Sequence, residues 1–116
     1  MDKNACKYLS DILTAITEIE VSTDKRGRRF DVFLNDYVFR KFVERNIEIM
    51  GEAMNRILKT YPSVNITAAR KIVDTRNFVI HGYDSLKPEI IWAIVINHLP
   101  LLKKEIMQLL DENSHI

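Results

Sequence analysis

One segment of this 116-residue chain carries an arginine, an asparagine and a histidine at a spacing that could support chemistry: Arg76, Asn77 and His81. A guanidinium is always charged and can stabilise negative charge on a phosphate, whereas an imidazole can accept or donate a proton near neutral pH. Together, the two groups could cleave RNA without a metal. The histidine would exchange protons with a ribose 2′-hydroxyl, and the arginine would stabilise the pentacovalent phosphorane.

The direction in which Arg76 points follows from helical geometry. At about 100° per residue, Arg76 lies on the same side of its helix as the apolar residues Ala69, Ile72, Val73, Val79 and Ile80. A guanidinium among apolar side chains is costly unless an anion meets it. Two interpretations remain open: an ion pair with a carboxylate of the preceding helix, Glu52 or Glu48, or a cleft that holds a phosphate.

A separate polar stripe on the same helix consists of Arg70, Asp74, Asn77 and His81. His81 lies at the predicted C-terminal end of the helix, next to Gly82. A histidine at this position either caps the last backbone carbonyls or acts as a catalyst, and both interpretations stay open.

Four stretches with helical periodicity position this segment. They cover residues 3–20, 31 or 35 to 61, 66–81 and 85–111. Pro100 is predicted to kink the last helix rather than end it, because the apolar pattern continues beyond it. Short connections between the helices predict an all-α fold, an antiparallel four-helix bundle, formed as a single domain by residues 1–116.

Three further positions carry expectations about packing. The apolar run 90–96 covers every side of the last helix, which predicts packing on two sides, either within the bundle or against another subunit. Gly51 is predicted to allow the close approach of another helix or of a ligand. His98 shares a stripe with apolar residues and is predicted to be a packed core histidine.

Charge and composition restrict the possible partners and location. The 17 basic and 16 acidic residues nearly cancel, so any RNA affinity must come from local clustering. One such cluster, Lys25 to Arg29, falls in a predicted loop at residues 22–29, which either contacts phosphates or is simply solvated. A single cysteine, no signal-peptide layout and no apolar run longer than seven residues predict a cytoplasmic protein without a membrane span. The three histidines lie too far apart for a local metal motif, so no metal or cofactor is expected.

The string R-N-x-x-x-H-x-Y, from Arg76 to Tyr83, resembles the signature of the HEPN superfamily. Within that superfamily it is most similar to the HepT-like toxins that are encoded beside a minimal nucleotidyltransferase. Residues 44–53 resemble the E-R-x-x-x-x-x-G-E-A segment of the same family, and residues 91–92 with 99–103 resemble its last helix. The three segments occur in the family's order.

This resemblance implies a HEPN-like bundle and a toxin ribonuclease, the toxin component of a toxin-antitoxin system. Arg76 and His81 match the catalytic pair of the family and Asn77 the polar residue that supports it. Independently of the resemblance, Glu52 is the carboxylate that we expect as the supporting ion pair of Arg76. Tyr83 matches a tyrosine that the partner nucleotidyltransferase, an MntA-like antitoxin, can modify with AMP. Homodimerisation would bring two motifs into one cleft. The alternative function is a non-catalytic module that binds a nucleotidyltransferase or a nucleotide through the same cleft.

Overall fold

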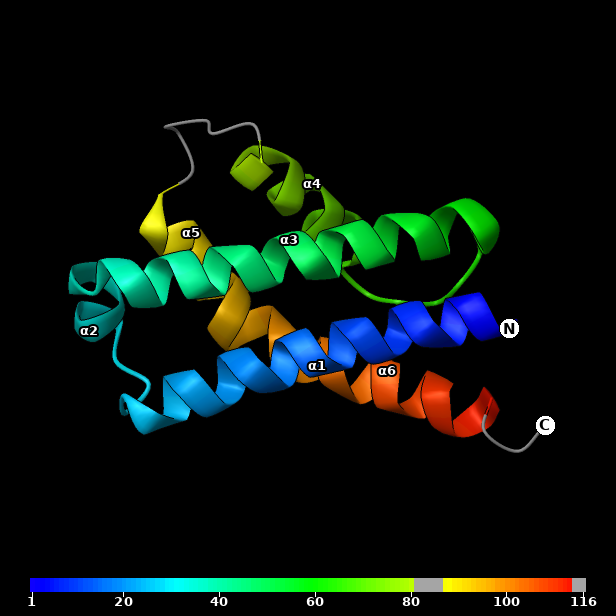
Figure 1. Cartoon of the computed structure of the whole chain (residues 1–116), viewed down its shortest axis with the longest axis horizontal. Helices are drawn as coiled ribbons and strands as arrows, with labels where there is room; N and C mark the ends of the chain where they lie inside the picture. The colour runs from blue at the N-terminus through cyan, green and yellow to red at the C-terminus, as the bar shows by residue number, and fades with distance from the viewer. Residues whose placement is uncertain (81–86, 114–116) are drawn as a thin grey trace.

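The computed structural model describes residues 1–80 and 87–113, with the backbone only for residues 78–80. Every regular element in this part of the chain is helical, which confirms the all-α prediction. Helix α1 (Lys3–Lys25) packs antiparallel to α3 (Tyr37–Thr60), α4 (Ala69–Ile80) lies on α3, and α6 (Leu99–Asn113) lies against α1 (Figure 1). These four longer helices form the predicted antiparallel bundle.

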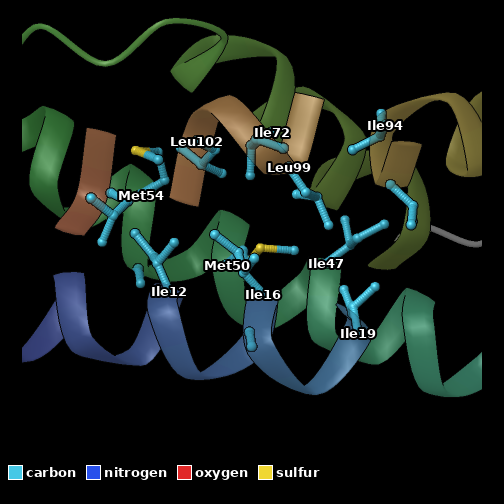
Figure 2. Close-up of a cluster of buried hydrophobic side chains, with 14 of the residues drawn as sticks. Ile12, Ile16, Ile19, Ile47, Met50, Met54, Ile72, Ile94, Leu99 and Leu102 are labelled. Atoms are coloured by element: carbon cyan, nitrogen blue, oxygen red, sulfur yellow. The ribbon is translucent and has the colours of Figure 1, made fainter. Parts of the chain in front are cut away.

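The core is formed where the apolar stripes of the four longer helices meet (Figure 2). Its fully buried side chains include Ile12, Ile16 and Ile19 of α1, Ile47, Met50 and Met54 of α3, Ile72 of α4, and Leu99 near the start of α6. Ile72 fixes the rotation of α4 about its own axis. Arg76 follows Ile72 by four residues and therefore lies on the same face of α4. The burial of Ile72 thus also directs Arg76 toward α3.

Helix α1 is longer than the sequence predicted, so the prediction of a loop from residue 22 was wrong. Thr23 is only 1% exposed and continues the buried stripe four residues beyond Ile19. The helix then ends in a tight turn in which the backbone N–H of Arg28 donates to the Thr23 carbonyl at 3.0 Å. Gly27 takes up the left-handed conformation of this turn with a φ of 74°.

Between α1 and α3 lies a short helix, α2 (Phe30–Asn35). The sequence suggested a single helix starting near residue 31 or 35, but the structure has one helix starting near each position. Asp36 separates them because its backbone is extended and its side chain accepts a hydrogen bond from the Phe39 N–H at 3.0 Å. An aspartate in this position caps the N-terminus of α3.

The last predicted helix is irregular in the middle, as its proline suggested. It consists of α5 (Pro88–Ala93), a π-helical segment η1 (Ile94–His98) and α6. In η1 the Leu99 N–H donates to the carbonyl of Ile94, five residues earlier. In a regular helix the ring of Pro100 would clash with the Ile96 carbonyl, and the wider turn relieves that clash.

The π-helical segment also aligns two apolar stripes. The buried residues before the proline are Ile91, Ile94 and Val95, and those after it are Leu99, Leu102 and Ile106. In an uninterrupted α-helix, the second set would point about 60° away from the first. A π turn contains more residues, so each of them rotates the chain by less, and both sets face the same core.

The apolar run 90–96 is covered on more than one side by its own chain. Trp92 packs against the rings of Phe30 and Phe33 in α2, with centroid distances of 6.1 and 5.2 Å. Ile91 faces the core, whereas Ile90 is 42% exposed. The two-sided packing predicted for this helix is therefore largely internal to the chain, and the apolar run by itself gives no argument for a second subunit.

Candidate functional site

The site begins at the point where α4 crosses α3, at Gly51. A Cβ atom added to Gly51 would lie 2.2 Å from the Cβ of Arg76 and 2.6 Å from its Cγ. It would also lie 3.2 Å from the carbonyl oxygen of Ile72. The absence of a side chain at Gly51 is therefore what permits the two helices to touch. Of the two roles predicted for this glycine, the structure shows the close approach of a helix.

The guanidinium of Arg76 extends from this crossing to a carboxylate of α3. Its Nη2 forms an ion pair with Oε2 of Glu52, while its Nη1 donates to Oδ1 of Asn77 at 2.8 Å. The Arg76 side chain is 22% exposed. The pairing with Glu52 expected from the sequence is present, whereas Glu48, the other candidate, pairs with Arg45 at 3.0 Å.

Glu52 is shared between two arginines. Its Oε2 pairs with Arg76, and its Oε1 accepts a hydrogen bond from Nε of Arg56 at 3.1 Å. Contacts with Tyr8 and then with Glu52 raise the pKa of Arg56 above its ordinary value. One carboxylate is thus shared by two guanidiniums. Of the two interpretations of Arg76 that the sequence left open, the structure shows the ion pair, and a phosphate at this position stays a prediction.

A cleft of about 300 Å³ opens beside this cluster. Three helices line it, contributing Tyr8 and Asp11 from α1, Arg45, Glu48, Glu52 and Arg56 among others from α3, and Arg76 from α4. Among the described residues, its three acidic and three basic side chains balance in charge. Tyr8 and Arg56 were not predicted from the sequence as site residues. Arg56 had a local signal, since it follows Glu52 by one helical turn. Tyr8 had none, because only the packing of α1 on α3 brings it there.

Not every predicted site residue can be placed. Asn77 is half-buried and directed to Arg76, while Arg70 and Asp74 of the same polar stripe are exposed. His81 and Tyr83 lie outside the described residues. His98 is half-buried in η1 and does not line the cleft.

The arginines of the Lys25 to Arg29 segment are engaged locally. Arg28 pairs with Asp24 at 3.1 Å, Arg29 with Asp31 at 2.6 Å, and Arg26 stacks over the Phe39 ring at 4.4 Å. The hydrogen bond from Arg29 lowers the pKa of Asp31. These contacts support the interpretation of a solvated segment rather than a phosphate site.

Neither a metal cluster nor a membrane span is found in the part of the chain that the structure describes. No three His, Cys, Asp or Glu side chains there are grouped so that they could hold a metal ion. Among the same residues, no helix combines the length and apolarity that crossing a bilayer requires.

The described residues therefore define an all-α domain with an arginine-containing cleft between three helices. Comparison with known proteins identifies its family. The family model described as "Ribonuclease HepT-like" matches residues 12–109, and the chain belongs to this family. The HEPN resemblance seen in the sequence is thereby confirmed, and the class of enzyme is ribonuclease.

Curated relatives cover nearly the whole chain. A Methanocaldococcus jannaschii protein with a provisional RNase name is 34% identical, over 97% of both chains. A protein of Thermococcus cleftensis named as a probable ribonuclease HepT is 32% identical, over 89% of this chain and 93% of its own. A Caldanaerobacter subterraneus protein, also with a provisional RNase name, is 28% identical over 92% and 95%. No solved structure matched the chain.

Proposed function

We propose that this chain is the toxin of a toxin-antitoxin pair, acting in the cytoplasm as an endoribonuclease that needs no metal. The observation that carries the proposal is the position of Arg76 at the edge of the cleft, held by Glu52 and Asn77, in a chain of the HepT-like ribonuclease family. An arginine fixed at both ends of its guanidinium is pre-organised to stabilise a charged transition state.

In the proposed reaction, the 2′-oxygen of a ribose attacks the adjacent phosphorus. His81 takes the proton from the 2′-hydroxyl, or gives one to the 5′-oxygen as the P–O5′ bond breaks. Arg76 stabilises the negative charge of the phosphorane, and Asn77 orients the guanidinium through its 2.8 Å hydrogen bond. The products are a 2′,3′-cyclic phosphate and a 5′-hydroxyl.

The chemistry of the product ends tests this function. Total RNA is incubated with the protein in the presence of EDTA, and the ends of the fragments are identified. We expect fragments that end in a 2′,3′-cyclic phosphate. Fragments with a 3′-hydroxyl, or cleavage that EDTA abolishes, would contradict the mechanism. A stable complex with the nucleotidyltransferase without any RNA cleavage would favour the binding module instead.

Regulation through Tyr83 is a second part of the proposal. Transfer of AMP from ATP to the Tyr83 hydroxyl, with release of pyrophosphate, would place a negative phosphate and an adenosine two residues from His81. This group repels the RNA backbone and blocks it sterically, so we expect cleavage to fall while the protein stays folded. Intact mass is measured after incubation with the neighbouring nucleotidyltransferase and ATP. If the Tyr83→Phe variant gains the same mass as the parent, the modified residue lies elsewhere.

The third part concerns assembly. We expect a two-fold symmetric dimer in which the two segments 76–81 face one cleft, since the family signature implies a site built from two copies. Light scattering at micromolar concentration should give twice the 13.6 kDa mass of one chain. A monomer that still cleaves RNA under these conditions would show that one motif is sufficient.

A further inference from the structure

The cleft beside Arg76 continues into a second hollow. This hollow has a volume of about 380 Å³ and follows α1 and α3 toward Thr60. Tyr8, Glu52 and Arg56 line both spaces, which therefore form one groove, here called the α1–α3 groove. Each space is within the size range of ordinary ligand sites. The groove can therefore hold more of a ligand than the phosphate proposed at Arg76.

A flat cation supported by an aromatic ring lies at the centre of the groove. The Arg56 guanidinium carbon lies 5.7 Å from the ring centroid of Tyr8. The other restraint on Arg56 is Glu52, which holds its Nε. With 55% of its side chain exposed, Arg56 leaves much of its surface open to solvent. A guanidinium plane fixed in this way is a surface on which a nucleobase can stack.

Glu52 sets the distance between this surface and Arg76. The two arginines bind the two oxygens of one carboxylate, so their guanidiniums lie one carboxylate group apart. An RNA that places a phosphate at Arg76 therefore brings an adjoining nucleotide to Arg56.

From this arrangement, we propose that the α1–α3 groove is an RNA subsite in which the nucleotide beside the cleaved phosphate stacks its base on Arg56, with Tyr8 behind the guanidinium. The proposal rests on the proposed function and assigns Tyr8 and Arg56 as substrate-binding residues. Because every base has a flat face, a stacking subsite of this kind binds all four bases with small differences.

The test measures RNA binding and turnover for Arg56→Gln and Tyr8→Leu. We expect each change to raise KM about tenfold and to leave kcat unchanged, a factor in the range that stacking of one base contributes. The Kd for an RNA with 2′-O-methyl groups, which cannot be cleaved by 2′-hydroxyl attack, should rise by the same factor. Arg28→Gln is the matched control, since Arg28 also pairs with an acidic residue four positions earlier and is similarly exposed.

Three outcomes would overturn the proposal. If both variants keep the parent's KM and Kd, the groove does not bind RNA, although the proposed function stands. If Arg56→Gln lowers only kcat and Tyr8→Leu has no effect, Arg56 merely holds Glu52. If the parent neither binds nor cleaves RNA, the subsite and the proposed function fail together. Thermal unfolding of each variant identifies losses caused by misfolding. If Tyr8→Leu does not fold, Arg56→Gln, which changes a side chain that is 55% exposed, decides the test.

Discussion

Replacing His81 with alanine should reduce the rate of RNA cleavage by a factor of about 10²–10⁴, the range that a positioned acid or base contributes. In the proposed reaction, no other imidazole near Arg76 in the sequence could take over the proton transfer. The thermal unfolding curve should not change, because the sequence predicts His81 at a helix end, where a side chain contributes little to the core. Cleavage of a defined RNA under single-turnover conditions measures the effect on the chemical step.

His98→Ala provides the matched control for this experiment. It also removes one imidazole, but from η1, away from the cleft. We expect it to retain the cleavage rate of the parent per folded molecule. A His81→Ala protein that cleaves as fast as the parent would show that the catalytic assignment is wrong. Equal losses in both variants would point to a general effect on folding.

Gly51→Ala should destabilise the protein by about 1–3 kcal/mol, the usual cost of forcing extra atoms into a packed contact. The new methyl group would lie 2.2 Å from the Cβ of Arg76, so α3 and α4 must move apart. The sign of the change in stability distinguishes a close helix crossing from an ordinary helical glycine. For a glycine in a helix without such a contact, the same substitution would stabilise by about 0.5–1 kcal/mol.

Urea unfolding measures the change in free energy for Gly51→Ala. Lys41→Ala, on the exposed side of the same helix, is the control and should change stability by no more than about 0.5 kcal/mol. The new methyl group would displace Arg76 itself. We therefore also expect a lower cleavage rate for the folded fraction of Gly51→Ala. An increase in stability would contradict the close helix crossing.

Part of the site could be predicted from one helix alone. The direction of Arg76 follows from the angle between successive residues, and the need for an anion follows from its apolar surroundings. Helix geometry alone did not separate Glu52, the expected partner, from Glu48, since both lie on one face of α3, a single turn apart. The position of α4 makes that choice, and Gly51 fixes that position. The place of Tyr8 in the cleft could not be predicted either, because it depends on how α1 packs on α3.

The order of the four long helices was more predictable than the helix ends. The apolar periodicity identified the bundle, but the end of α1 depended on the burial of Thr23, a polar residue that the pattern did not count. An irregularity near Pro100 followed from the chemistry of proline. The irregularity takes the form of a π-helical segment before the proline. That form depends on how α5 and α6 each pack against the core, so it could not be derived from the local sequence.

The π-helical segment Ile94–His98 affects how sequences in this family should be aligned. A π turn contains one residue more than the α turn it replaces, so it behaves as a single-residue insertion within a helix. Where a relative lacks this extra residue, the gap belongs between positions 94 and 98. A gap placed elsewhere in the helix would shift every residue between that gap and η1 by one position, and so would pair core residues with surface residues in that stretch.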